Sequence, residues 1–435
     1  MPLALDLMYF LVLLASAPVL AYRSIRFGKY REGWNQKLFG KVPRRLGQGP
    51  CIWFHAVSVG EVLLLKPILA EVERRRPGWE VVLSTGTPTG LSVARGAYPD
   101  IMTFYAPLDF SWATRRALSR IRPTVLALVE LELWPNLVRA AKVAGARVAI
   151  VNGRLSAKSH HGYKSLRGPL GPTIRRLDAI AAQTSSYAAR FIDLGVPAEK
   201  VQVTGSIKFD GLETDRNNPR TQALRRALKL KPSELIFVAG STMEGEELAA
   251  LNAYRAARID HPTLRLIVVP RHAERFDAVA DLLKREGLPV VRRSGRVELP
   301  VPGAEPPVIL VDTLGELSSV WGLADVAFVG GSLFPGRGGQ NMIEPAAYGA
   351  AVLFGRFTEN FRDTVEQLLE RDGACRVLNA DDLRYKLKQD LDDPESATAR
   401  GVSARTFVLA QNGASGRTLA ELDRQVDAAL AGKSA

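Results

Sequence analysis

The sequence predicts an α/β protein with two doubly wound, Rossmann-like domains that face a cleft, preceded by an N-terminal membrane anchor helix. Three observations support this prediction. Short apolar runs alternate with longer segments of helical period along most of the 435 residues, which is typical of parallel sheets covered on both faces. A polar, helix-poor interval at residues 211–221 divides these runs into two series. Finally, residues 3–21 are apolar except for Asp6.

Composition is typical of a globular protein and argues against several kinds of site. Hydrophobic residues make up 46% and charged residues 24%, and the length suffices for two or three domains. The two cysteines, Cys51 and Cys375, lie in separate halves, which argues against a disulfide framework and fits a reducing compartment. The histidines show no H-x-x-x-H spacing and G-x-S-x-G is absent, so we expect neither a metal site nor a serine hydrolase.

The apolar run at residues 3–21 is long enough to cross a bilayer or to embed in it. A cleaved signal peptide is less favoured, because no Lys or Arg precedes the run and Pro18 directly follows the A-S-A of residues 15–17. A buried globular helix is the other alternative. Residues 22–47 hold eight basic residues and one acid, so we expect a retained anchor with its basic flank on the cytoplasmic side, against anionic head groups.

Six apolar runs with strand character precede the polar interval, and six follow it. A last periodic segment, residues 418–430, is expected as a closing helix. We therefore predict an anchor and basic flank at residues 1–33, a first domain at 34–212 and a second domain at 213–435. The expected strands are residues 51–57, 80–84, 102–105, 124–130, 147–151 and 178–182, then 235–240, 264–270, 289–291, 307–311, 326–330 and 351–354.

A single acid, Glu61, follows the first of these runs, in the sequence WFHAVSVGE. The carboxyl end of a strand in an open parallel sheet is a favoured place for an active site. An acid in the first turn of a helix is also common, because the free amides and the helix dipole stabilise its negative charge. Position alone therefore leaves two interpretations, a catalytic carboxylate and an ordinary N-terminal helix acid.

Other polar groups of the first domain also follow predicted strands. Glu130 and Glu132, in ELELWPN, would share one strand face by the two-residue period, with helix capping as the alternative. Lys208, in TGSIKFD, precedes the polar interval, which would place it near the cleft. Residues 133–177 contain nine basic residues and no acid, so this basic zone is either an anion-binding surface or a solvated face.

The second domain contains a glycine-rich segment, GGSLFPGRGGQNMIEPAAYG, that runs from a strand through a loop to a helix start. Glycines allow a ligand to approach the backbone, helix-start amides bind anions, and Glu344 could accept both hydroxyls of a ribose. Neither a Walker motif nor G-x-G-x-x-G is present, and a purely structural turn is the alternative. The turns AGSTMEGEE, PRH and DTLGEL also follow strands, so all of them could form one nucleotide pocket at one sheet edge.

In this order, HAVSVGE, ELELWPN, NGRLS, GSIKFD, AGSTMEGEE, PRHAERF, DTLGEL and the glycine-rich segment resemble the 3-deoxy-D-manno-octulosonic acid (Kdo) transferases of lipopolysaccharide assembly. The resemblance covers nearly the whole chain. It implies a glycosyltransferase B fold at the inner membrane, with the catalytic domains on the cytoplasmic side. It also implies CMP-Kdo as donor, a lipid A precursor as acceptor, and no cofactor or metal.

The resemblance further implies roles for single residues. Glu61 would be the general base, and Glu132 and Lys208 would support the transition state. A His often occupies the positions of Gln340 and Met243 in this family, which leaves the donor contacts of those two side chains open. The basic zone would bind acceptor phosphates through Arg154, Lys158, Lys164 and Arg167. Contacts to CMP would fall on Arg271, His272, Leu314, Gly315, Glu316, Asn341, Met342, Ile343 and Glu344.

Two alternatives remain at this point. The first is a glycosyltransferase of the same fold with another nucleotide sugar, which thermal protection by different nucleotides would distinguish. The second is a membrane-bound protein that binds anionic lipid or nucleic acid without chemistry, and its binding would fall steeply with salt. Nucleic acid is not expected as a partner, because aromatic residues do not alternate with the basic residues as stacking platforms.

Overall fold

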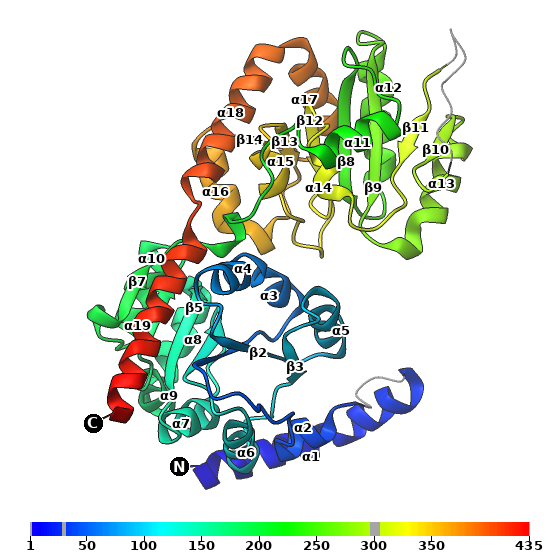
Figure 1. Cartoon of the computed structure of the whole chain (residues 1–435). Coiled ribbons are helices and arrows are strands. Elements are labelled where there is room, and N and C mark those ends of the chain that lie inside the picture. Colours follow the sequence, from blue (N-terminus) through cyan, green and yellow to red (C-terminus); the bar gives the residue numbers. More distant parts are fainter. Residues whose placement is uncertain (1, 28–31, 296–304, 435) are drawn as a thin grey trace. The chain divides into compact units, whose positions relative to one another are not determined.

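The computed structural model describes residues 2–27, 32–295 and 305–434, and the chain divides into two compact units. Unit 1 comprises residues 1–210 and 411–435, and unit 2 comprises residues 211–410. Within the described ranges, each unit contains a parallel sheet of seven strands with helices packed on it (Figure 1). The prediction of two parallel α/β sheets is therefore confirmed.

The sheet of unit 1 has the strand order β3-β2-β1-β4-β5-β6-β7. Its strands are β1 Cys51–His55, β2 Glu80–Thr85, β3 Met102–Tyr105, β4 Val125–Val129, β5 Arg147–Gly153, β6 Ala179–Ala182 and β7 Val201–Val203. Its helices are α1 Pro2–Phe27, α2 Trp34–Phe39, α3 Val59–Leu64, α4 Lys66–Arg75, α5 Pro88–Ala97, α6 Ser111–Ile121, α7 Pro135–Val143, α8 Ala157–Ser165, α9 Arg167–Ile174, α10 Ser185–Asp193, η1 Ala198–Lys200, η2 Ile207–Phe209 and α19 Ala414–Ser434. The first six strands overlap the predicted runs, whereas β7 was not predicted.

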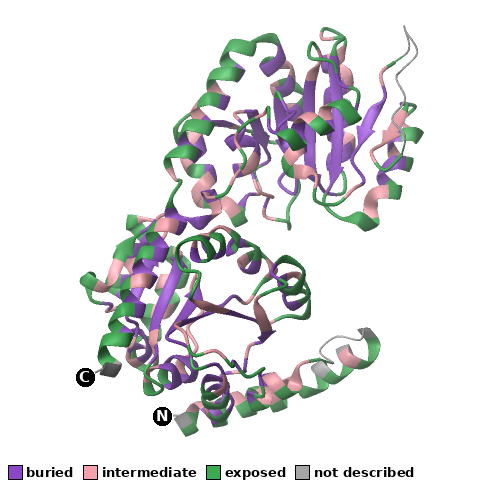
Figure 2. Ribbon diagram, in the orientation of Figure 1, coloured by how far each residue is buried: buried purple, intermediate pink, exposed green. Residues whose placement is uncertain are grey.

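Alternation along β1 sends its side chains to two separate cores. Ile52 and Phe54 pack on the face that α3, α4 and α19 cover, together with Leu422 of α19. Trp53 packs on the opposite face, with Leu126 and the apolar side chains of α6 and α7. All of these residues are buried. The strands of this sheet are largely coloured as buried (Figure 2), because helices cover a parallel sheet on both faces.

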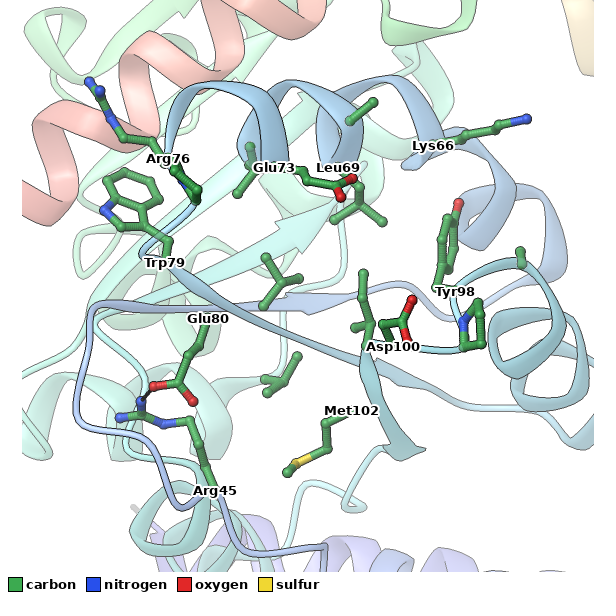
Figure 3. A pocket seen from close by; sticks show the side chains of 18 residues that line it. Arg45, Lys66, Leu69, Glu73, Arg76, Trp79, Glu80, Tyr98, Asp100 and Met102 are labelled. Carbon is green, nitrogen blue, oxygen red and sulfur yellow. Dashed lines mark hydrogen bonds and ion pairs between the residues drawn. The ribbon is translucent and has the colours of Figure 1, made fainter.

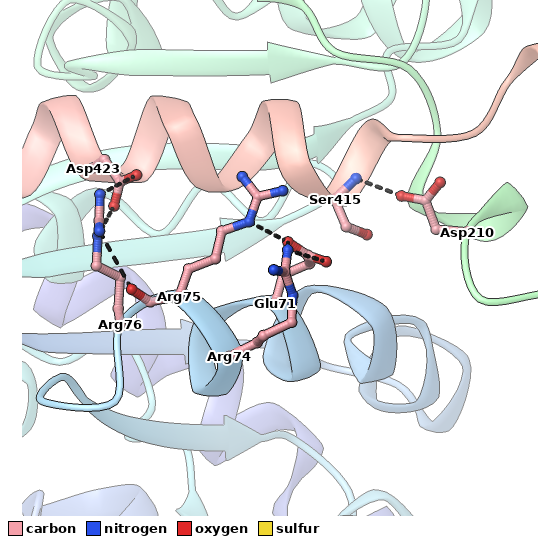
Figure 4. A network of polar contacts seen from close by, with 7 residues as sticks. All are labelled: Glu71, Arg74, Arg75, Arg76, Asp210, Ser415 and Asp423. Atoms are coloured by element: carbon pink, nitrogen blue, oxygen red, sulfur yellow. Dashed lines mark hydrogen bonds and ion pairs between the residues drawn. The ribbon is translucent and has the colours of Figure 1, made fainter.

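The last helix, α19, belongs to unit 1, whereas the sequence prediction assigned all of residues 213–435 to the second domain. The Arg76 guanidinium donates to both carboxylate oxygens of Asp423, at 2.8 and 3.0 Å (Figure 4). The Asp210 carboxylate accepts the N–H groups of Gly413, at 2.7 Å, and Ser415. The assignment was wrong because the periodicity of a helix identifies its apolar stripe but does not identify the sheet that the stripe covers.

Helix α1 contacts the body of unit 1 through the one acid of its apolar run. The buried Asp6 carboxylate accepts the Ser111 N–H at 2.8 Å, the Ser111 hydroxyl at 2.6 Å and the Asn136 amide at 3.1 Å. Within the described residues, we find no helix whose length and apolar character would let it cross a membrane. Much of the α1 ribbon is nevertheless coloured as exposed (Figure 2). The exposed large apolar residues of α1 are Leu3, Leu7, Met8, Phe10, Leu11, Val12, Leu14, Val19, Tyr22 and Ile25.

The sheet of unit 2 has the strand order β10-β11-β9-β8-β12-β13-β14. Its strands are β8 Leu235–Thr242, β9 Leu264–Pro270, β10 Val290–Arg292, β11 Val308–Leu310, β12 Val326–Val329, β13 Ala351–Phe354 and β14 Ala374–Arg376. Its helices are α11 Pro219–Ala227, α12 Glu246–Arg258, η3 Ala273–Arg275, α13 Phe276–Arg285, α14 Leu317–Trp321, α15 Ile343–Ala347, η4 Glu359–Phe361, α16 Arg362–Glu370, α17 Ala380–Asp392 and α18 Pro394–Ala410. The short β14 was not predicted, and the other strands overlap the predicted runs.

Candidate functional site

Glu61 lies in the first turn of α3, directly after β1. The Ser58 hydroxyl accepts the Glu61 N–H at 3.2 Å, and the Glu61 carboxylate accepts the Ser58 O–H at 2.8 Å and the Val57 N–H at 2.8 Å. These bonds form a capping box, for which the spacing S-x-x-E in the sequence is a known signal. Burial raises the pKa of Glu61, and the hydrogen bonds from Ser58 and Val57 oppose that rise. Glu61 therefore does cap the helix as an N-terminal acid. Its carboxylate also lies after the end of β1 and has a raised pKa, so a catalytic role stays open.

Glu132 is the second carboxylate at this edge of the sheet. Strand β4 ends at Val129, and Glu130 adopts a φ of 59°, so the two-residue alternation stops before Glu132. The expectation that Glu130 and Glu132 share a strand face is therefore wrong. Burial, followed by the negative charge of Glu61, raises the pKa of Glu132 to about 7. The influence of the Glu61 charge on Glu132 shows that these two carboxylates belong to one electrostatic site.

Lys208 joins this site through Glu130, because its Nζ lies 3.4 Å from a Glu130 carboxylate oxygen. Asn152, near the end of β5, holds the turn that contains Lys208. Its Oδ1 accepts the Ile207 N–H at 3.0 Å, and its φ of 54° is a left-handed value that Asn tolerates better than most residues. The Asn-Gly pair of NGRLS was the available signal for such a backbone, and sequence reasoning gave Asn152 no role.

His55 and Trp134 support the loop that contains Glu132. The Trp53 indole donates to Ser84 Oγ at 2.7 Å, so the Ser84 hydroxyl can donate its own proton to His55 Nδ1, 2.9 Å away. Burial lowers the pKa of His55 to about 4, which keeps the ring neutral at physiological pH. The His55 and Trp134 rings meet edge to face at 6.2 Å. Tyr163, on α8, also belongs here, since burial and then the charge of Glu132 raise its pKa.

The predicted acceptor residues lie on α8, on α9 and in the turn before α8. Lys158, Lys164 and Arg167 are exposed, and Arg154 is partly buried. Although residues 133–177 contain no acid, Asp193 of α10 faces them and contacts Lys164 Nζ at 3.0 Å. Lys158 and Arg167 make no ion pair with any residue that the structure describes, so they are the stronger candidates for binding an external anion.

In unit 2 the turns after β8, β9, β11 and β12 lie at the carboxyl edge of one parallel sheet, as the sequence predicted. Glu246, the first residue of α12, connects two of these turns. The residue is 1% exposed, and its carboxylate accepts four backbone N–H groups. The donors are Met243 at 2.8 Å, Gly331 at 2.7 Å, Ser332 at 3.0 Å and Leu333 at 2.9 Å. Sequence reasoning missed this role, because it recognised only an acid at a helix start.

Five of the predicted CMP-binding residues follow β9 and β11. Arg271 and His272 are exposed, and the Arg271 N–H donates to the Thr242 carbonyl at 3.0 Å, which places Arg271 beside the turn after β8. Leu314 is 78% exposed, next to Gly315 with its φ of 83°. The Glu316 carboxylate instead contacts Arg293 at 3.0 Å, so it already has a cationic partner.

The remaining predicted CMP contacts lie at the start of α15. The Asn341 amide donates to Glu344 at 2.9 Å, and burial raises the pKa of Glu344. Met342 and Ile343 are 0% and 1% exposed, and the Ile343 N–H donates to Asn341 Oδ1 at 3.0 Å, so both residues lie beneath the surface.

The two positions that depart from the family pattern differ in their surroundings. Met243 is buried at 7% exposure, and its N–H donates to Glu246. Gln340 is partly buried, its N–H donates to the Gly330 carbonyl at 3.2 Å, and its side chain lies against Gly331. Gln340 is therefore the one of these two side chains that stands beside the glycine-rich turn.

A cavity of about 830 Å³ in unit 1 lies apart from these residues. Trp79, Glu80 and Met102 line it at the starts of β2 and β3, and Arg45 forms an ion pair with Glu80 at one side (Figure 3). Glu61 instead follows the carboxyl end of β1. The cavity and the carboxylate site therefore lie at opposite edges of the sheet.

Comparison with known proteins identifies relatives over most of the chain. Residues 26–211 match the family model described as 3-deoxy-D-manno-octulosonic-acid transferase (kdotransferase). The 3-deoxy-D-manno-octulosonic acid transferase of Haemophilus influenzae is 34% identical over 400 residues, which cover 91% of this chain and 92% of the relative. The enzyme of the same name from Bordetella pertussis is 34% identical over 414 residues, with 90% and 93% coverage.

Among solved structures, a glycosyltransferase from Rickettsia africae aligns with a TM-score of 0.56. The alignment covers 88% of this chain and 99% of that chain, at 13% sequence identity. At this identity the likeness concerns the fold alone.

Proposed function

The chain belongs to the 3-deoxy-D-manno-octulosonic acid transferase family, and from this premise we propose that it is an inverting glycosyltransferase. It moves Kdo from CMP-Kdo to a lipid A precursor and releases CMP. The observation that supports this proposal most directly is the pairing of Glu61 and Glu132 at one sheet edge, each with a raised pKa. Burial raises the pKa of Glu61, and a raised pKa makes a carboxylate a stronger base, which suits Glu61 to take up a proton.

The chemistry requires one bond to form and one to break. The oxygen of an acceptor hydroxyl attacks the anomeric carbon of Kdo, the bond from that carbon to the CMP phosphate breaks, and its electron pair leaves with the phosphate. Glu61 takes the hydroxyl proton. In its ionised form, which predominates above its pKa of about 7, Glu132 stabilises positive charge at the anomeric carbon, and Lys208 supplies positive charge against the departing phosphate.

The donor binds on unit 2 in this proposal. Arg271 is exposed beside the turn after β8, as a phosphate-binding guanidinium must be. Glu344 and Asn341 are hydrogen-bonded to each other, and Glu344 offers its carboxylate to the ribose hydroxyls. Glu246 holds the backbone of the neighbouring turns in place by accepting their N–H groups.

The acceptor and the membrane are assigned to unit 1. Exposed Lys158 and Arg167 are available for the phosphates of a lipid A precursor. The exposed apolar side chains of α1 support a retained helix at the inner membrane, with the catalytic units on its cytoplasmic side.

Mass spectrometry of the reaction product tests the function. Purified protein, CMP-Kdo and a lipid A precursor should yield an acceptor heavier by one Kdo or by a whole number of Kdo residues. A parallel measurement of thermal unfolding with CMP, UDP and GDP should give the largest stabilisation with CMP. Transfer from a UDP- or GDP-sugar, with no product from CMP-Kdo, would instead establish a different donor for the same fold.

A further inference from the structure

Two cavities of about 240 and 250 Å³ lie beside the first turn of α1. Leu3 lines one of them and Leu5 lines the other, and both cavities share Asn136 and Arg139 of α7. The two cavities are therefore neighbouring parts of one surface where α1 meets α6, α7 and α9. Neither cavity is lined by a residue to which we assign donor binding, acceptor binding or catalysis.

The charged residues that line these cavities are all arginines. Arg115 of α6 lines the first cavity, Arg176 lines the second, and Arg139 lines both. The Arg115 Nε donates to the Ser111 carbonyl at 2.9 Å and the Arg176 Nη1 donates to the Pro172 carbonyl at 2.8 Å, which orients both guanidinium groups. Among the residues that the structure describes, none of these three arginines forms an ion pair.

Asp6 and Asp109, the two buried acids that contact the cavity-lining Asn136, already have donors. The Asp6 carboxylate accepts from Ser111 and from the Asn136 side chain. The Asp109 carboxylate accepts the N–H groups of Asn136 and Leu137, at 3.0 and 2.8 Å, and the Tyr9 hydroxyl at 3.1 Å. Both acids are buried and accept from backbone and side-chain donors, so the exposed Arg115 and Arg139 and the partly buried Arg176 remain available to an anion from outside.

Apolar side chains border the same cavities. Leu3 is 82% exposed and Val143 is 77% exposed, and both line the first cavity. The exposed apolar side chains of α1 continue from Leu7 onward. The surface therefore combines guanidinium groups, which can donate two hydrogen bonds to one phosphate, with exposed aliphatic side chains beside them. This combination suits a molecule with an anionic head group and aliphatic tails.

We propose that these paired cavities bind the phosphate of an anionic phospholipid of the membrane. Arg139 contacts the phosphate from between the two cavities, Arg115 and Arg176 flank it, and the acyl chains lie along the exposed side chains of α1. The inference deepens the membrane placement proposed above and does not depend on sugar transfer.

Vesicle flotation of the full-length protein tests this site. The vesicles contain phosphatidylcholine alone or phosphatidylcholine with phosphatidylglycerol, and neither donor nor acceptor is present. Arg139→Gln should weaken binding to the phosphatidylglycerol vesicles by about tenfold, as expected for losing a hydrogen bond between charged groups. Binding to pure phosphatidylcholine should change little, because the exposed apolar surface of α1 is unchanged.

Arg116→Gln is the matched control. Arg116 is exposed on the same helix as Arg115, lines neither cavity and carries the same charge. If Arg116→Gln weakens binding as much as Arg139→Gln does, the attraction is diffuse and the proposed site is wrong. Thermal unfolding of both variants establishes that they fold.

Inorganic phosphate and glycerol phosphate distinguish the source of the anion. Stabilisation by these soluble anions that disappears in Arg139→Gln, without any preference for phosphatidylglycerol vesicles, would overturn the lipid assignment in favour of a free-phosphate site. Turnover of detergent-dispersed acceptor is measured on the same samples. A failure of the proposed transferase function would appear as no product from the unmodified protein, whatever the vesicle result.

Discussion

At the scale of single residues, Glu61 illustrates how a carboxylate can close a helix and still be suited to catalysis. Its two hydrogen-bond partners, Ser58 and Val57, precede it in the same turn. The Glu61 carboxylate accepts the Ser58 O–H and the Val57 N–H on separate oxygens, and the Glu61 N–H donates to the Ser58 hydroxyl oxygen. A Gln side chain can accept the Val57 N–H through its one carbonyl oxygen and donate its NH2 to the Ser58 oxygen, but it cannot take up a proton. Capping and base catalysis can therefore be separated by substitution.

Glu61→Gln should fold, bind CMP with unchanged affinity and lose about a hundredfold or more in kcat, since a general base contributes roughly 10²–10⁴-fold. Steady-state kinetics and calorimetry measure the two quantities. Ser58→Ala is the control, because it removes the cap and retains the carboxylate. It should cost about 1 kcal/mol of stability and leave kcat nearly unchanged. Near-normal turnover in Glu61→Gln would leave Glu61 as a helix cap only.

Glu132 should make stability depend on pH. Its folded pKa of about 7 lies above the ordinary value of 4.5. Between these two values the unfolded chain has lost a proton that the folded chain retains, so the free energy of unfolding falls as the pH rises through this window. A Gln at this position does not titrate, so Glu132→Gln should lack this decrease in the free energy of unfolding. Calorimetry should therefore show Glu132→Gln gaining Tm over the unmodified protein at about pH 8 and gaining less at about pH 5. An equal difference at both pH values would contradict the raised pKa.

At the scale of secondary-structure elements, the strand-end turns of unit 2 are expected to bind the donor. In the proposed donor pocket, Arg271→Ala would remove a phosphate contact after β9, and Glu344→Ala would remove ribose hydrogen bonds at α15. Each should weaken CMP binding about ten- to hundredfold, as for lost hydrogen bonds to charged groups. Calorimetric titration measures the affinities, with the exposed Arg384→Ala on α17 as control. Unchanged CMP affinity in both variants would show that the donor does not bind at the carboxyl edge of the unit 2 sheet.

Helices α8 and α9 are expected to bind the acceptor. Replacing Lys158 and Arg167 together with Gln should raise the acceptor KM about tenfold or more and leave CMP affinity unchanged. Lys164→Gln should have a smaller effect, because Asp193 already pairs with Lys164. Initial-rate kinetics, with donor and acceptor concentrations both varied, separates a change in acceptor KM from a change in donor binding. If CMP affinity falls by the same factor, these residues support the fold instead of the acceptor.

At the scale of the whole molecule, α1 is expected to localise the enzyme without building its active site. Deleting residues 1–21 exposes the Ser111 N–H and the Asn136 amide to water, which can replace Asp6 as their acceptor. The truncated protein should be more soluble, turn over detergent-dispersed acceptor and lose most of its activity on acceptor in vesicles. A truncated protein that folds, as judged by calorimetry, and has no activity in detergent would show that α1 contributes to the site itself.

The sequence predicted where most strands lie and at which edge of the sheet each polar motif lies. Both predictions depend on the pattern of apolar and polar residues over a few neighbouring positions. Twelve apolar runs were expected and each overlaps a strand, whereas β7 and β14, of three residues each, are too short to show a pattern. The positions of Glu61 and Arg271 after β1 and β9 followed from the same runs. The four hydrogen bonds to Glu246 could not be predicted, since their donors lie up to 87 residues away in the chain.

The sequence by itself determined the fold class, the family and the ends of strands at which polar residues gather. Those features depend on alternation, helical period and turn residues, which act over a few positions. Only the tertiary structure decided that α19 packs on unit 1, that Asp193 pairs with Lys164 and that Asp6 ties α1 to Ser111 and Asn136. These outcomes depend on which distant surfaces complement each other in shape and charge, and such complementarity exists only after the chain has folded.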